Sequence, residues 1–535
     1  MLKNVHLSLV GLAALILAAI IAAIVVVPTA TVGVIKVLYN FLTEDLAWLF
    51  LLMGVAYSAI AFVCFFTKYG DIRLGGRDAK PMFNTFMWNA MNICNALAAG
   101  VLIFGLCEWM FYVKTPPFGL EPGSTAAYEM ASAYGMFHWG FSAWAFYLVP
   151  ALAMGYLFWN KKCASLRISD LSVGILGGDS LWKRVARFLL DGAIVFGYFA
   201  AMMTTVGIGT PVMGELASHL LGIPNTFELK LGVILVFCLF FTLSASRSIA
   251  RGMGRISNFN VALGLAFFAF VLISGDTAFI LDNSVMAIGT NIREFLRMSF
   301  NSDAVAHTGF VQTWTIFYWA WYVAICYMCA LWIARTSYGR TFREIAVANC
   351  IWAPLACWLT FCILGNYGMG QELFHGLKVS DAVGEIGTNG AALMVIQTLP
   401  LPKLAVFVFL VLIFFNLATS ATGNGIALSL YTSKGIARED EADPRFKASW
   451  CMLFLVLPVG ILLLERAIPG LNVLSTIQSM ITVSSIPMFF VLIALFAAFL
   501  KAFRTDVRSG EILGSVSVHR TARWEEAVAE ARENR

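Results

Sequence analysis

A run of aromatic residues near the middle of the chain has the composition of a cation-binding surface. Residues 314–322 read Trp-Thr-Ile-Phe-Tyr-Trp-Ala-Trp-Tyr. At about 100° per residue on a helix, Trp314, Trp321 and Trp332 fall close to one line, and Tyr322 borders it. A helix in lipid needs only residues such as leucine and alanine, whereas the faces of clustered Trp and Tyr rings attract a cation. The segment therefore predicts a site for a quaternary ammonium group, a cation with no hydrogen to donate.

A second aromatic cluster lies in residues 138–147, His-Trp-Gly-Phe-Ser-Ala-Trp-Ala-Phe-Tyr. On a helix Trp139, Trp144 and Tyr147 spread over an arc of about 140°, so they could form one wall of a site and the first cluster the other. A quaternary ammonium between the walls gains about 2 kcal/mol from each well-placed ring once it is desolvated. The alternative is that the rings fill core space or line the membrane interfaces, which is favoured for a single Trp but not for two clusters. His138 is a lone imidazole, which favours packing or hydrogen bonding over proton carriage.

Hydroxyl groups interrupt a third apolar stretch. Residues 416–425 read Asn-Leu-Ala-Thr-Ser-Ala-Thr-Gly-Asn-Gly, and the adjacent Thr419 and Ser420 offer oxygen ligands without adding charge. Together with carbonyls freed by a break in a helix, such groups hold Na⁺ near the midplane of transporters. The alternative, which we consider the commoner one, is that the hydroxyls donate to their own helix or to a neighbouring helix.

Small residues and one carboxylate characterise a fourth stretch, residues 94–108. The small residues over 94–100 and at Gly105 allow close approach of another helix or local unwinding. Glu108 lies near the expected end of this span, where an acidic residue is either interfacial or functional, and pairing inside the helix bundle is favoured over proton carriage. The sequence has no Walker loop, HExxH motif or Ser-His-Asp arrangement, so no enzymatic activity is predicted.

The composition indicates which elements position these residues. Of the 535 residues, 60% are hydrophobic and 13% are charged, whereas about a quarter are charged in soluble proteins. These values predict an all-α polytopic membrane protein, in which each span takes about 20 apolar residues. The 11 cysteines are scattered without metal-type spacing, and the net charge of +5 does not indicate nucleic-acid binding. No cofactor is expected.

Hydropathy predicts about twelve transmembrane helices. They fall near residues 8–28, 47–67, 84–113, 130–158, 187–212, 229–246, 257–280, 309–335, 342–368, 403–432, 449–468 and 474–502. The first apolar run is too long for a signal peptide and is expected to be retained. The segment 284–300 is amphipathic and is expected on the membrane surface. In the polar tail, residues 524–535 are expected to form a short solvated helix.

Basic residues alternate from loop to loop. The loops after the second, fourth, sixth, eighth and tenth spans are rich in Lys and Arg, and the intervening loops are poorer in them and carry Asp and Glu. By the positive-inside rule, the basic loops and both termini are cytoplasmic, which requires an even number of spans. We therefore expect an integral protein of the plasma (inner) membrane.

The same stretches resemble the betaine/choline/carnitine transporter family. TWTIFYWAWY and the following LWIARTSYGRTFREI resemble the eighth span of that family and the basic loop behind it, and HWGFSAWAFY resembles its fourth span. YGDIRLGGRDAKPMF resembles the loop before its third span, and SASRSIARGMGRISNFN resembles the junction between its sixth and seventh spans. The resemblance extends over residues 10–500.

The resemblance implies a leucine-transporter-like inverted-repeat core that works by alternating access. It divides the chain into two peripheral N-terminal helices with a basic loop, a first repeat, an interfacial helix and loop, a second repeat and a cytoplasmic tail, at residues 1–80, 81–282, 283–308, 309–502 and 503–535. It also implies a homotrimer in membrane lipid. The implied substrates are betaines, carnitine, choline and related onium compounds.

The resemblance also assigns site residues. The aromatic box of the family falls on five rings, those of Trp139, Trp144, Tyr147, Trp321 and Tyr322. Its sodium site falls on two hydroxyls and three carbonyls, those of Thr419 and Ser420 and of Asn416, Cys94 and Leu97. Some members run without sodium by placing an arginine where the ion would lie. Arg247 is a weak candidate for that role and fits a cytoplasmic loop charge better.

Together these observations predict a secondary transporter for a small onium zwitterion, acting as a symporter with Na⁺ as the coupling ion. An alternative within transport is a sodium-independent exchanger or a proton-coupled carrier of another small solute. An alternative from another class is a membrane sensor that binds the same ligand without moving it.

Overall fold

The regular structure of the chain is helical. The computed structural model describes residues 5–96, 99–246, 249–434, 443–454, 456–468 and 470–509. Within these ranges, extended backbone pairs at two isolated bridges, Val5 with Ser433 and Arg73 with Thr341, and all longer elements are helices. The predicted fold class, an all-α polytopic membrane protein, is confirmed.

Where the structure describes them, the residues of all the predicted spans are mainly helical. In the described part of the chain, nine helical segments are long and apolar enough to cross a membrane. They are Leu7–Val26 (α1), Ala47–Phe66 (α3), Thr125–Asn160, Ile256–Ser274, Val311–Thr336, Phe342–His375, Pro402–Tyr431 (α19), Pro444–Ala467 and Val473–Arg508 (α22). The remaining predicted spans coincide with α4 (Thr85–Ala96) and α5 (Ala99–Lys114), with α10 (Leu181–Leu221), and with α11 (Phe227–Ser246).

Several of these segments are built from more than one helix. The fourth span contains α6 (Thr125–His138), α7 (Phe141–Gly155) and the π turn η5 (Tyr156–Asn160). The eighth contains the π turn η6 (Val311–Thr315) and α14 (Ile316–Thr336). The ninth span is assembled from α15 (Phe342–Val347), η7 (Ala348–Trp352), α16 (Ala353–Thr360), η8 (Phe361–Gly365) and α17 (Asn366–His375). The eleventh span is assembled from α20 (Pro444–Leu453) and α21 (Val456–Ala467).

Two helices differ from the sequence-based prediction. α2 (Pro28–Asn40) and the π turn η2 (Phe41–Asp45) fill the interval between the first two spans, where the sequence predicts no helix. Pro28 stands in the first turn of α2, where its fixed φ favours a helix and no N–H is required. The amphipathic segment begins earlier than predicted, because α12 (Ile249–Ser274) ends sooner and α13 runs over Thr277–Phe300. Arg247 and the helix expected at 524–535 lie outside the described residues.

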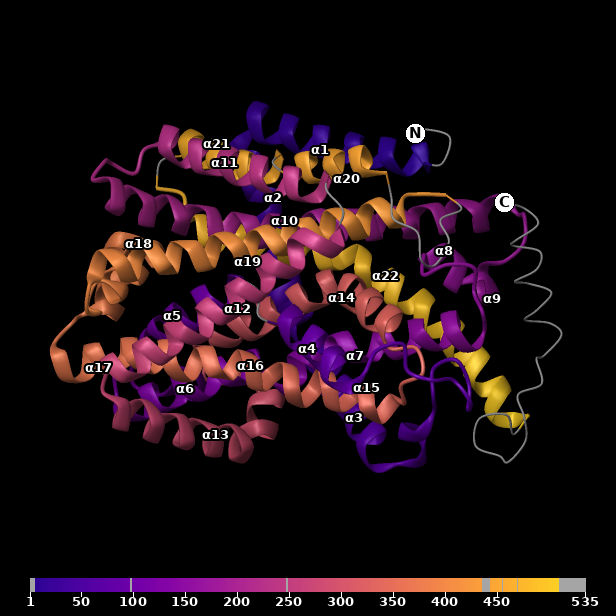
Figure 1. Cartoon of the computed structure of the whole chain (residues 1–535), viewed down its shortest axis with the longest axis horizontal. Helices are drawn as coiled ribbons and strands as arrows, with labels where there is room; N and C mark the ends of the chain where they lie inside the picture. Colours follow the sequence, from indigo (N-terminus) through magenta and orange to yellow (C-terminus); the bar gives the residue numbers. More distant parts are fainter. Residues whose placement is uncertain are drawn as a thin grey trace.

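The two aromatic stretches lie on neighbouring helices in the middle of the bundle. α7 and α14 pack against each other along their length (Figure 1). Every residue of α7 from Ser142 to Gly155 is buried. α14 also packs against α22, and α10 packs against α22 and α19. α7 therefore lies at the centre of the bundle, with its aromatic residues enclosed by neighbouring helices.

Glycines set a close approach between the third and ninth spans. A Cβ on Gly105 of α5 would lie 2.7 Å from Thr360 Cγ2, and a Cβ on Gly365 would lie 2.8 Å from the Gly105 carbonyl oxygen. Small residues at membrane helix contacts permit such approaches. The expectation that small residues of the third span allow close packing therefore holds at Gly105.

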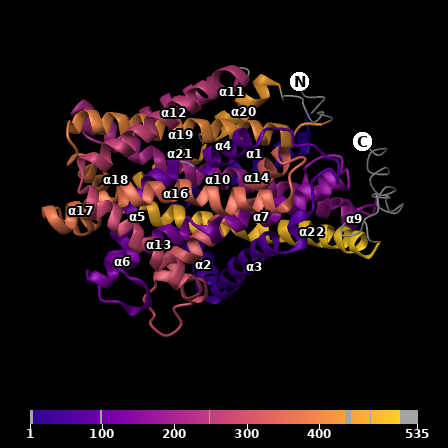
Figure 2. The same ribbon diagram turned by 60° about the horizontal axis from the view of Figure 1, so that its bottom comes forward.

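The described ends of the chain lie at one end of the molecule. The start of α1 and the end of α22 are at the same end as α8 (Ile168–Leu171) and α9 (Val173–Leu176), which belong to a basic loop (Figure 1). α17 and α18 (Val379–Ile396) are at the opposite end (Figure 1). Figure 2 shows α22 running along the bundle beside α7. This arrangement agrees with the predicted common side of the basic loops and the termini, and the side of the membrane stays a prediction.

Candidate functional site

The fourth span is broken where its aromatic cluster begins. Trp139 and Gly140 separate α6 from α7 and have non-helical backbone angles, φ −107° with ψ 22° and φ −104° with ψ −150°. A Cβ on Gly140 would lie 2.4 Å from the Met136 carbonyl oxygen, so a side chain at this position has no room. The break leaves the His138 carbonyl available to accept a hydrogen bond from the Tyr322 hydroxyl, 2.7 Å away. A local sequence feature therefore ties the two aromatic helices together.

The five predicted rings contact one another in a continuous cluster, here called the ring cluster: Trp139, Trp144, Tyr147, Trp321 and Tyr322. Within the fourth span, Trp144 and Tyr147 have centroids 5.3 Å apart. Tyr147 lies 5.6 Å from Tyr322, and Trp139 lies 5.8 Å from Trp321, both pairs nearly perpendicular. Trp321 and Tyr322 stack at 6.3 Å with 17° between their planes. All five side chains are buried. The structure thus brings the five together, and their role in substrate binding stays a prediction.

The indole nitrogen of Trp321 is a buried donor inside the ring cluster. It has no hydrogen-bond partner among the residues that the structure describes. Most buried donors in proteins are paired, so an unpaired one requires an explanation such as a missing ligand or water. An acceptor group on a ligand held by the ring cluster would satisfy this N–H.

Three further residues, of which the sequence analysis missed only Phe104, complete the surroundings of the ring cluster. Phe104 of α5 lies 6.2 Å from Trp139 and 6.0 Å from Trp321, measured between ring centroids. Tyr318 stacks on Trp321 at 6.0 Å. A Cβ on Gly100 would lie 3.5 Å from Trp321 Cη2 and 3.8 Å from Trp139 Cη2. The third span therefore places a residue without a side chain against the rims of both Trp rings.

Glu108 lies behind the ring cluster as a fully buried carboxyl group. Its oxygens accept hydrogen bonds from the hydroxyls of Tyr112 and Tyr318 and, at 3.2 Å, from Trp139 Nε1. The Tyr112 hydroxyl is also 2.6 Å from His138 Nδ1. The expected pairing of Glu108 inside the bundle is confirmed, and His138 has the expected hydrogen-bonding role. The sequence gives no sign that Glu108 reaches the aromatic residues, because Trp139 and Tyr318 belong to two other spans.

The tenth span differs from the broken helix expected there, because α19 is continuous from Pro402 to Tyr431. Thr419 Oγ1 donates to the carbonyl oxygens of Phe415 and Asn416, at 2.9 and 3.0 Å. This contact is the commoner alternative, a hydroxyl bonded to its own helix. A hydroxyl that donates its hydrogen keeps lone pairs for a cation. The assignment of Thr419, Ser420 and Asn416 to a sodium site therefore stays a prediction.

The third span contains the other predicted sodium ligands. Leu97 lies outside the described residues, and Cys94 belongs to α4 but its side chain is not described. Both assignments stay predictions.

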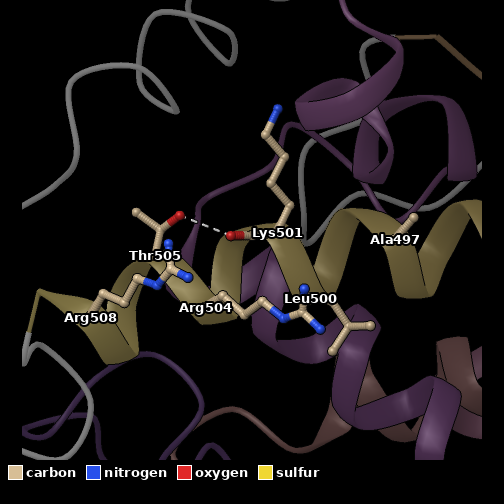
Figure 3. A pocket seen from close by; sticks show the side chains of 6 residues that line it. All are labelled: Ala497, Leu500, Lys501, Arg504, Thr505 and Arg508. Carbon is tan, nitrogen blue, oxygen red and sulfur yellow. Dashed lines mark hydrogen bonds between the residues drawn. The ribbon is translucent and has the colours of Figure 1, made fainter.

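A surface pocket at the end of α22 is separate from the ring cluster. It is lined by Ala497, Leu500, Lys501, Arg504, Thr505 and Arg508 (Figure 3). Thr505 Oγ1 donates to the Lys501 carbonyl at 2.9 Å, and Lys501 Nζ donates to the Gly174 carbonyl at 2.6 Å. The lining is basic and contains none of the predicted site residues, so the pocket belongs to the surface of the molecule.

The helical spans define a polytopic membrane protein, in which a buried ring cluster lies where two spans meet. Residues 8–508 match the model of the betaine/carnitine/choline family of transporters, BCCT. The chain belongs to this family. It is also similar to a protein of Acinetobacter baumannii named carnitine transporter, with 30% identity over 398 residues that cover 74% of this chain and 72% of that one. The suspected family is confirmed, and with it the expectation of a transporter and not an enzyme.

Proposed function

We propose that the protein is a sodium-coupled symporter that moves a small onium zwitterion across the plasma membrane by alternating access. Its family membership makes the protein a membrane transporter of the betaine, carnitine and choline type. The observation that carries the substrate class is the ring cluster, whose five side chains are buried and in mutual contact across two spans. Desolvated ring faces attract a methylated ammonium group at about 2 kcal/mol for each well-placed ring.

The unpaired N–H of Trp321 supports a zwitterion rather than a simple cation. A carboxylate is a strong acceptor for such a donor, and glycine betaine and carnitine carry a carboxylate together with the trimethylammonium group. Carnitine is also the compound in the name of the Acinetobacter baumannii relative. Choline carries only the cation and a hydroxyl, so we expect it to bind more weakly.

Sodium coupling rests on Thr419 and Ser420, which are half-buried on α19. This helix packs against α5, so the tenth span lies beside the third span, which carries the other predicted ligands. Neutral oxygen ligands near the midplane are the groups that transporters use for Na⁺. We also propose a homotrimer in membrane lipid with both termini in the cytoplasm, on the basis of the family resemblance and the alternating basic loops.

Uptake by proteoliposomes tests the proposal. The purified protein is reconstituted and supplied with labelled glycine betaine, carnitine, choline or dimethylsulfoniopropionate, with and without an inward sodium gradient. We expect uptake of a zwitterion that the gradient drives. Uptake of none of the four would contradict the substrate class. Sodium-independent uptake that requires counter-substrate inside would indicate an exchanger, and binding without uptake would indicate a sensor.

A further inference from the structure

We propose that Glu108 is a proton site that sets the affinity of the ring cluster, so that onium binding and protonation of Glu108 oppose each other. The proposal rests on the proposed function, because it requires that the ring cluster binds an onium group. It adds a second ligand, the proton, and assigns it to a residue that neither the ring cluster nor the predicted sodium site contains.

Hydrogen bonds connect the carboxyl group of Glu108 directly to the rings. Trp139 Nε1 and the Tyr318 hydroxyl both donate to Oε2 of Glu108. Trp139 belongs to the ring cluster, and Tyr318 stacks on Trp321 at 6.0 Å and on Tyr322 at 5.9 Å. Donation to an anion is stronger than donation to a neutral acceptor and polarises the donor. The ionised form of Glu108 therefore makes the ring faces more negative and more attractive to a cation.

The surroundings of Glu108 supply little compensating charge. The titratable groups that face it are Tyr112 on α5, His138 on α6, and Tyr318 and Tyr322 on α14. His138 Nδ1, at 3.5 Å, is the basic group within ion-pair distance, and in the described part of the chain no Lys or Arg pairs with Glu108. The other elements that pack against α5 place no charged group at that distance in the described residues. A buried anion is costly unless a cation or a proton neutralises it.

A hydrogen-bonded chain accommodates either protonation state of Glu108. It runs from Glu108 through Tyr112 and His138 to Thr315, with Tyr112 Oη 2.6 Å from Nδ1 and Nε2 3.0 Å from Thr315 Oγ1. With Glu108 ionised, Thr315 donates to Nε2, Nδ1–H donates to Tyr112, and Tyr112 donates to Oε1. With a proton on Oε1 every hydrogen bond in the chain reverses its direction. Oε1–H donates to Tyr112, Tyr112 donates to Nδ1, and Nε2–H donates to Thr315. Both arrangements keep the three hydrogen bonds of the chain, so one added proton changes the hydroxyl orientations and the His138 tautomer but moves no side chain.

Equilibrium binding across a pH series tests the proposal. Isothermal titration of purified protein with glycine betaine is carried out between about pH 8 and about pH 5.5, a range in which the carboxylate of the ligand stays ionised. By linkage, wild-type affinity should fall as the pH falls, by up to about tenfold per pH unit for one displaced proton. Glu108→Gln should bind at the weak level throughout and lose the pH dependence. Glu129→Gln, an exposed acid on the neighbouring α6, is the matched control and should behave as wild type.

A second variant separates this role from a structural one. Tyr318→Phe keeps the stacked ring and removes the hydroxyl that donates to Glu108, so it should reduce the pH dependence while leaving the folded yield unchanged. If Glu108→Gln does not fold, the pH dependence of binding to Tyr318→Phe alone tests the proposal. The proposal would be overturned if the variants kept the pH dependence of the wild type, or if the wild type bound glycine betaine with the same affinity at every pH. Neither result would contradict the onium site. Absence of binding to the wild type at every pH would overturn the onium site itself, and this proposal with it.

Discussion

At the scale of single residues, Gly140 decides how the two aromatic helices meet. The fourth span breaks at Trp139 and Gly140, and the broken backbone requires a glycine because a Cβ at position 140 would lie 2.4 Å from the Met136 carbonyl oxygen. The break places Trp139 beside Trp321 and lets the Tyr322 hydroxyl bond to the His138 carbonyl. The identities of the five rings can be predicted from sequence, because each lies in a conspicuous aromatic run. The break that joins them cannot, because it depends on where neighbouring carbonyls lie.

The partners of Glu108 show the same limit of sequence reasoning. An acidic residue near the end of an apolar span is predicted to pair inside the bundle, and Glu108 does. It does not predict that Tyr318 and Trp139, which are 210 and 31 residues away in sequence, are the donors. Contacts of that separation are set by helix packing, which local patterns do not encode.

Replacing Trp321 by alanine should weaken onium binding far more than replacing Trp332. The side chain of Trp321 is 6% exposed within the ring cluster, whereas Trp332 on the same helix is 40% exposed. Loss of one desolvated cation–π contact costs about 2 kcal/mol of binding free energy, or about 30-fold in Kd. Isothermal titration of both variants with glycine betaine measures the difference, and equal losses would count against the ring site.

Thr419→Ala should raise the sodium concentration needed for half-maximal uptake several-fold without lowering the amount of folded protein. The hydroxyl donates to carbonyls of its own helix, so its removal leaves little unpaired. Thr422→Ala is the control, since Thr422 is buried and donates to the Ala418 carbonyl in the same way. Sodium titrations of uptake in proteoliposomes give the comparison. An unchanged sodium requirement in Thr419→Ala would contradict its role as a ligand.

At the scale of elements, the tenth span shows why helix continuity is hard to predict. Its hydroxyl and small residues suggest an interruption, yet α19 continues through them, and hydroxyls such as that of Thr419 donate to carbonyls of their own helix. The fourth span, in contrast, reads as one apolar run and breaks at Trp139 and Gly140. Composition predicts that a helix crosses the membrane more reliably than it predicts where the helix is interrupted.

Gly105→Ala should destabilise the contact between the third and ninth spans. Its Cβ would lie 2.7 Å from Thr360 Cγ2, so the helices must separate or distort. Overpacking of this kind costs about 1–3 kcal/mol in the free energy of unfolding. Thermal denaturation of the purified protein in detergent measures the loss. Gly289→Ala on α13 is the control, since a Cβ there meets nothing within 4 Å, and equal stability of the two variants would contradict the close approach.

At the scale of the whole molecule, apolar length and charge alternation are enough to predict the bundle. Each span is identified because lipid requires about 20 apolar residues, whatever the neighbouring helices are. The described ends of the chain lie at the same end of the molecule, as an even number of spans requires (Figure 1). The helix α2 escapes prediction because it is short and is not needed to cross the membrane.

Tags fused to either terminus should be accessible to protease or antibody only in inside-out vesicles. A tag inserted at residues 302–308, which join α13 to η6, should be accessible only in right-side-out vesicles. The expectation follows from the excess of Lys and Arg in alternate loops. Termini accessible from opposite faces would show that the number of spans is odd.

The central claim is that desolvated rings hold a positive charge, and one comparison of ligands tests it most directly. Equilibrium binding of glycine betaine to the wild-type protein is compared with that of its carbon isostere, in which a tert-butyl group replaces the trimethylammonium group. Shape, apolar surface and carboxylate are retained, and the cation is removed. The account predicts that the isostere binds about 100-fold more weakly, because the cation–π contribution of the rings is lost. Equal affinity for the two ligands would contradict it.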